Sequence, residues 1–100
     1  MSALRVDLQS GFAGDHVVID VAGRTVYDKR AVSTDYAIGR ADAVAVEVKP
    51  GPQNVEVRLP ERRLARKFAI EVEDRDVYAA ASVDGAEITF RLSDEPFQYL

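Results

Sequence analysis

Cysteine and tryptophan are absent from this chain of 100 residues, and methionine and histidine occur once each. Without cysteine the chain can form no disulfide, no thiol nucleophile and no cysteine-based zinc or iron–sulfur site. The single histidine, His16, excludes a metal site built from several imidazoles and leaves one candidate general base. Because most common catalytic mechanisms need residues that are missing, we expect a protein that is not an enzyme and that uses no cofactor or metal.

Long apolar runs are missing too, since none approaches the roughly 20 residues of a membrane span. No basic segment followed by an apolar one opens the chain, so we expect a cytoplasmic protein with no membrane interaction. The formal net charge of −4 argues against nucleic-acid binding, which draws on a positive surface. The length of 100 residues predicts a single domain over residues 1–100, and the apolar fraction of 47% is typical of a globular chain.

Apolar residues recur mostly at every second position, which is the period of a strand with one buried face. Turn residues such as Ala22-Gly23, Pro50-Gly51-Pro52 and Asp84-Gly85 separate the alternating segments. Strands are expected at 4–8, 17–21, 25–29, 36–38, 44–48, 55–59, 68–72, 77–83 and 88–92. Short strands at this regular spacing predict an all-β antiparallel sandwich of about eight or nine strands, immunoglobulin-like or transthyretin-like.

Two segments allow finer predictions. The dipeptide Asp84-Gly85 suits a type I′ hairpin turn, which would place Ala81 opposite Ile88 and Tyr78 opposite Arg91. The segment PERRLARKF, residues 60–68, is rich in helix formers and follows a proline start. A strand is nevertheless favoured there, because the alternation continues through it into 68–72 and only one arginine interrupts it.

Three segments resemble a known type of module in their order: IDVAGRTVY at 19–27, VEVKPGPQNVEVRLP at 46–60 and DVYAAASVDG at 76–85. Together they are similar to small bacterial β-sandwich modules of the PEGA and transthyretin-like kind. The resemblance covers about two thirds of the chain and consists of turn chemistry. The Pro-Glu-Gly-Ala core and the usual export signal of those modules are missing. The resemblance implies an accessory or interaction domain and supplies no catalytic residues.

The chain ends in SDEPFQYL, and its aromatic and aliphatic groups are unusual where most domains fray into polar tails. Phe97, Tyr99 and Leu100 either pack against their own sandwich or form a site for a partner. The first function hypothesis is a non-catalytic interaction module. It would bind a protein partner or form a homodimer through an edge strand and the C-terminal aromatic residues.

Basic residues gather between positions 58 and 67, where five Arg or Lys residues accompany one Glu, a net charge of +4. Arg62, Arg63 and Arg66 are candidates for contact with an acidic protein partner, although a solubilising hairpin tip is the favoured explanation for them.

The alternative hypothesis is binding of a small ligand or carbohydrate on an exposed face that Tyr27, Tyr36 and Tyr78 would line. The absence of tryptophan, which sugar platforms favour, weighs against it. His16 is interpreted as a surface residue at the start of a strand.

Overall fold

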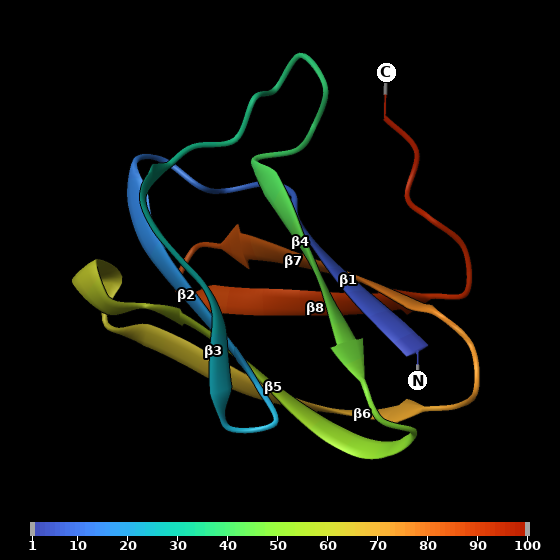
Figure 1. Ribbon diagram of the computed structural model, residues 1–100. Helices are drawn as coiled ribbons and strands as arrows, with labels where there is room; N and C mark the ends of the chain where they lie inside the picture. Colours follow the sequence, from blue (N-terminus) through green and yellow to red (C-terminus); the bar gives the residue numbers. More distant parts are fainter. Residues whose placement is uncertain (1, 100) are drawn as a thin grey trace.

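The computed structural model describes residues 2–99, which form eight strands in two stacked four-stranded sheets (Figure 1). The first sheet has the order β4-β1-β7-β8 and the second β3-β2-β5-β6. The strands are β1 (Ser2–Leu8), β2 (Asp15–Val21), β3 (Arg24–Val32), β4 (Asp42–Val48), β5 (Gly51–Leu59), β6 (Leu64–Val72), β7 (Val77–Asp84) and β8 (Glu87–Ser93). The predicted all-β sandwich is confirmed.

Strand direction is mixed in the first sheet. β1 and β7 run parallel, with Leu4 opposite Val77 and Leu8 opposite Ala81, whereas the other strand pairs of the described chain are antiparallel. The antiparallel expectation therefore does not extend to this pair. Alternation reports which face of a strand is buried and carries no information on the direction of its neighbour.

The core lies between the sheets and is built from the alternating residues. In β1, Leu4, Val6 and Leu8 all point inward and are buried. Burying each such side chain stabilises the fold by roughly 1.5–3 kcal/mol. Phe12, in the loop between β1 and β2, is also buried in this core, although it belongs to no strand. The remaining buried core residues include Val17, Ile19, Val21, Val55, Val57, Leu59, Ile70, Val72, Ala79, Ala81 and Ile88.

The hairpin turns follow the turn residues, with one shift of position. Ala22 and Gly23 join β2 to β3 with φ of 53° and 78°, the two positive angles of a type I′ turn. The β7–β8 turn consists of Gly85 and Ala86 rather than Asp84 and Gly85. Of these two residues only Gly85 has a positive φ, which is the pattern of a type II′ turn. Asp84 is then the last residue of β7.

That shift changes the cross-strand partners but keeps the buried face. Ala81 lies opposite Phe90 rather than Ile88, and Tyr78 lies opposite Ser93 rather than Arg91. The predicted pairs are thus wrong by two positions. An even shift leaves each side chain on its predicted face, so small residues still oppose large ones.

The predicted strand at 36–38 is wrong, because these residues form a turn. The side chain of Asp35 accepts a hydrogen bond from the Ala37 N–H at 3.0 Å, and its carbonyl accepts one from Gly39 at 2.7 Å. Gly39 has a φ of 81°, which favours glycine. Asp35 thus nucleates a local turn that outcompetes the extended conformation.

The segment from 60 to 68 contains both predicted elements. Pro60–Arg62 form one turn of 3₁₀ helix, labelled η1, which ends at Arg63 with a φ of 55°. Strand β6 follows from Leu64, so the preference for a strand is confirmed and the strand begins four residues before Phe68. No helix within residues 2–99 has the length and apolar character needed to cross a membrane.

Candidate interaction site

After β8 the C-terminal segment bends away from the line of the strand (Figure 1), and Tyr99 contacts the outward-pointing Asp7 of the first sheet. The hydroxyl of Tyr99 donates a hydrogen bond to Asp7 Oδ2 at 2.6 Å and accepts one from Gln9 Nε2 at 3.0 Å. The guanidinium of Arg91 lies 5.1 Å from the ring centre of Phe97. Phe97 and Tyr99 thus contact their own domain, as the first explanation of the tail expects; Leu100 lies outside the described residues.

The contact with the C-terminal segment explains why Asp7 is buried. It points outward from β1, yet it is only 2% exposed because the tail covers it. Arg5 Nε lies 2.9 Å from Asp7 Oδ1, so two donors compensate the buried charge. Burial and the hydrogen bond to Asp7 raise the pKa of Tyr99. Sequence reasoning missed this site because its two partners are 92 positions apart.

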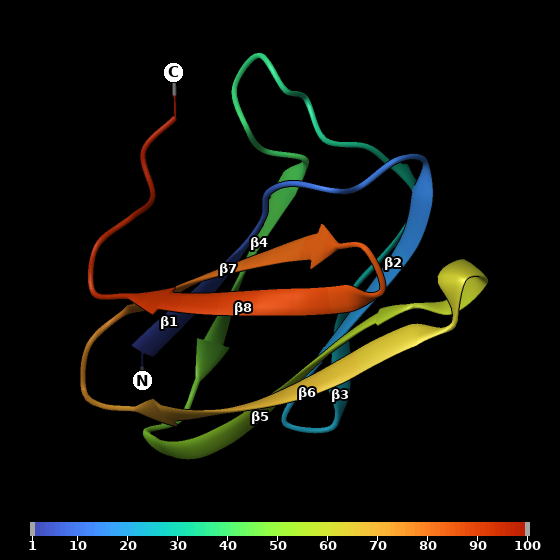
Figure 2. The same ribbon diagram turned by 180° about the vertical axis from the view of Figure 1, so that it is seen from behind.

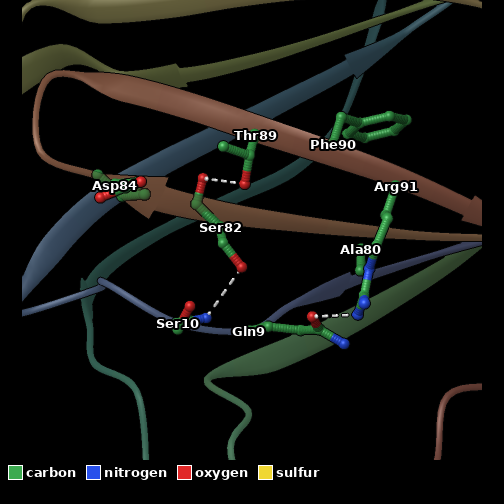
Figure 3. Close-up of a pocket in the computed structure, with 9 residues that line it drawn as sticks. Gln9, Ser10, Ala80, Ser82, Asp84, Thr89, Phe90 and Arg91 are labelled. Atoms are coloured by element: carbon green, nitrogen blue, oxygen red, sulfur yellow. Dashed lines mark hydrogen bonds between the residues drawn. The ribbon is translucent and has the colours of Figure 1, made fainter.

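A shallow hollow of about 470 Å³ lies beside the tail on the same outer face. Figure 3 shows Gln9, Ser82 and Arg91 along it, with Phe90 pointing away on the other side of β8. Arg91 donates to Gln9 Oε1 at 3.1 Å, and the Ser10 N–H donates to the Ser82 hydroxyl at 3.2 Å. Its lining contains no histidine that would activate a hydroxyl. The hollow offers donors for a small polar ligand and no catalytic pair.

Arg62 has a structural partner rather than a free charge. Its guanidinium binds both carboxylate oxygens of Asp15, at 2.7 and 2.6 Å, and donates to the Gly11 carbonyl at 3.1 Å. Asp15 is 5% exposed and also accepts the Ala13 N–H. This bidentate pair ties η1 to the loop before β2. The predicted basic surface is therefore smaller than the composition indicates.

The other two predicted arginines differ from each other. Arg66 donates to the Ile88 carbonyl at 3.0 Å and lies over the ring of Phe68. Arg63 is exposed at the end of η1. The three arginines therefore do not form one recognition patch, since two of them are engaged inside the fold.

The three predicted tyrosines are not brought onto one exposed face. Tyr27 is 6% exposed and donates to Asp42 at 2.8 Å, whereas Tyr36 is 73% exposed in the turn after Val32. Tyr78 is half-buried in β7. His16 Nε2 lies within hydrogen-bond distance of Asp28 Oδ1, at 2.7 Å, at the start of β2. Within residues 2–99, no cluster of three His, Asp or Glu side chains is arranged to hold a metal.

The side of the sandwich between β6 and β8 carries apolar groups that are partly or half exposed. Figure 2 shows these two edge strands one above the other. Phe68 and Phe90 stack across the gap, with ring centres 4.1 Å apart and an interplanar angle of 16°. Leu92 at the end of β8 is 52% exposed. We call this surface, formed by Phe68, Phe90 and Leu92, the β6–β8 seam.

The backbone pairing shows which groups of β6 are unpaired. The Ala22 N–H donates to the Asn54 carbonyl at 2.9 Å, so even-numbered residues of β5 face β2 and odd-numbered ones face β6. Val55 lies opposite Phe68, so even-numbered residues of β6 face β5. The backbone N–H and C=O groups that point to the free edge belong to Ala65, Lys67, Ala69 and Glu71.

The other three edges are irregular or have one edge group already bonded to a side chain. β3 pairs with β2 through two register shifts and contains Ala31 with a φ of 57°, irregularities that hinder strand addition. In β4 the side chain of Asp42 accepts the Ala43 N–H at 2.8 Å. In β8 the Ile88 carbonyl accepts Arg66. Only β6, within the described chain, pairs regularly along all nine residues and has no side chain bonded to its free edge groups.

Comparison with known proteins adds no family. No protein-family model matches the chain, and no curated protein matches it significantly. The resemblance to PEGA and transthyretin-like modules stays a prediction.

Proposed function

We propose that this protein is a non-catalytic interaction module that binds a protein partner by strand addition along the free edge of β6. The observation that carries the proposal is the regular, nine-residue edge with unpaired backbone groups at every second residue. Main-chain hydrogen bonds give affinity in this mode of binding, and side-chain pockets give specificity.

The β6–β8 seam would supply the specificity. A strand added beside β6 turns every second side chain inward, toward Phe68 and the half-exposed Leu92. Apolar residues at those positions of the partner would cover the seam and remove apolar surface from water. The C-terminal aromatics have a smaller part in this proposal than the sequence predicted, because they cover Asp7 of their own chain.

An alanine-to-proline substitution tests the edge directly. The Ala69 N–H points to the free edge and the side chain is exposed, so Ala69→Pro removes a donor that the monomer does not use. Ala45→Pro is the matched control. The Gln9 N–H donates to the Ala81 carbonyl at 2.9 Å, so odd-numbered residues of β1 face β7 and Ala45 faces the free edge of β4.

Wild type and both variants are immobilised and incubated with cell extract, and the retained proteins are identified by mass spectrometry. A partner by this mode is retained by wild type and Ala45→Pro and lost with Ala69→Pro. The purified partner should then slow hydrogen exchange at the amides of Lys67, Ala69 and Glu71. Equal retention on all three matrices, with no protection of those amides, refutes the proposal.

A second candidate function, binding of a small polar ligand, is favoured by the hollow of about 470 Å³ beside the tail. Arg91 and Gln9 would bind a carboxylate or hydroxyl group there, and Ser82 and Thr89 add further hydroxyls. Titration with a panel of acidic and neutral sugars, followed by NMR of the Gln9 side-chain amide, tests this candidate. No shift of that signal at millimolar ligand argues against it.

A further inference from the structure

We propose that the partner of β6 is a second copy of this chain, which pairs antiparallel with β6 around a twofold axis at Ala69. This inference rests on the proposed function and specifies its partner. Seven residues, 66–72, pair in each copy. The second sheets of the two copies then join into one continuous sheet of eight strands, and β6 no longer has a free edge.

The backbone groups of the two copies match in this register. With Ala69 opposite Ala69 of the second copy, Lys67 lies opposite Glu71 of the second copy, and both residues turn their unpaired groups to the free edge. An antiparallel pair exchanges two hydrogen bonds at each such position. With the twofold axis at Ala69, the backbone N–H and C=O groups of Lys67, Ala69 and Glu71 that are unpaired in the monomer therefore all form hydrogen bonds between the copies.

Charge complementarity favours this register over the neighbouring one centred on Phe68. Lys67 and Glu71 are exposed on the same outer face, and neither forms an ion pair with another described residue. Glu56 lies opposite Lys67 in β5, but its carboxylate is 3.6 Å from Arg58. The twofold axis at Ala69 forms two Lys67–Glu71 pairs between the copies, whereas an axis one residue earlier places Lys67 opposite Ala69.

The inner face supports the same register. Phe68 lies opposite Ile70 of the second copy, an aromatic residue beside a β-branched one, which is a favourable cross-strand combination. Arg66 lies opposite Val72 of the second copy, and its guanidinium already binds the Ile88 carbonyl. The apolar side chains of Phe68, Ile70 and Val72 would therefore meet between the copies, with the hydrogen-bonded Arg66 at each end of the paired segment.

A charge exchange tests the register. Sedimentation equilibrium is measured from about 1 µM to about 1 mM for wild type, K67E, E71K and the double variant K67E/E71K. Each single variant places two like charges opposite each other twice and should weaken dimerisation by about tenfold or more. The double variant restores opposite charges in the reversed order and should recover most of the wild-type dissociation constant. Circular dichroism confirms that each monomer is folded.

Ala69→Pro separates this inference from the proposed function. Loss of dimerisation with this variant but no effect of the charge exchange overturns the register and leaves strand addition at β6 intact. A wild-type protein that stays monomeric at about 1 mM overturns the second copy as partner, while selective capture of another protein still supports the proposed function. Dimerisation that survives Ala69→Pro overturns the second copy as the partner of β6, while the retention experiment still decides the proposed function.

Discussion

The hydrogen bond between Tyr99 and Asp7 gives the sharpest prediction about stability. Tyr99→Phe keeps the ring beside Arg40 and removes only the hydroxyl that donates to the buried carboxylate at 2.6 Å. A hydrogen bond to a charged group contributes about 1.5–3 kcal/mol. Because Tyr99 is half-buried and water can replace part of the bond, we expect a loss of about 1–2 kcal/mol.

Thermal unfolding followed by circular dichroism measures this loss. For a domain of this size, 1 kcal/mol corresponds to about 4–8 °C, so Tm should fall by roughly 4–16 °C. Tyr78→Phe is the matched control, because the Tyr78 hydroxyl forms no hydrogen bond within residues 2–99. Equal Tm values for wild type and Tyr99→Phe would show that the tail does not hold Asp7. Removal of residues 96–100 should destabilise the fold further, since it also uncovers Asp7.

The pH dependence of this loss identifies its cause. Burial and Asp7 raise the pKa of Tyr99 above the value of about 10 in an unfolded chain. The contribution of a group with a raised pKa is complete below the unfolded pKa and is lost as the pH rises through the folded pKa. The difference in stability between wild type and Tyr99→Phe should therefore be constant from pH 7 to 9 and shrink above about pH 10. A difference that is unchanged at pH 11 would contradict the hydrogen bond as its source.

Two further predictions concern the loop before β2. Arg62→Ala leaves the buried Asp15 without its bidentate partner, and we expect a loss of about 2–3 kcal/mol in chemical denaturation; Arg62→Lys should recover part of it, and no loss would contradict a structural role. Gly11→Ala places a Cβ 1.9 Å from the Val83 carbonyl oxygen at a φ of 88° and should lower Tm far more than Gly14→Ala, whose φ is also positive but whose Cβ meets open space. Similar Tm values for both glycine variants would refute the close approach.

The sandwich could be predicted because alternation is a local property. A residue such as Leu4 or Val6 reports by its own type which side of the strand is buried, and the structure places both in the core. The Ala22-Gly23 turn is local in the same way, since glycine supplies a positive φ whatever the rest of the chain does.

The candidate sites could not be predicted to the same degree, because they depend on contacts that alternation does not encode. Asp7 looks like a solvated strand residue until Tyr99 covers it. Asp15 and Arg62 are 47 positions apart and meet only because β2 and β5 are neighbours. Phe12 has no periodic signal at all, since it belongs to a loop. The roles of Asp7, Asp15 and Phe12 can therefore be interpreted only once the order of the strands is known.

Which strands lie at the sheet edges also follows from the strand order, and this changes how Lys67 is interpreted. A lysine on an edge strand normally discourages strand addition, because its charge opposes an incoming chain. In β6 that charge lies four residues before Glu71, so most incoming strands, and most registers of the same strand, leave Lys67 without an opposite charge. A second copy centred on Ala69 satisfies both residues at once. The lysine would then exclude other partners and select one register, which is why reversing both charges should restore what reversing one destroys.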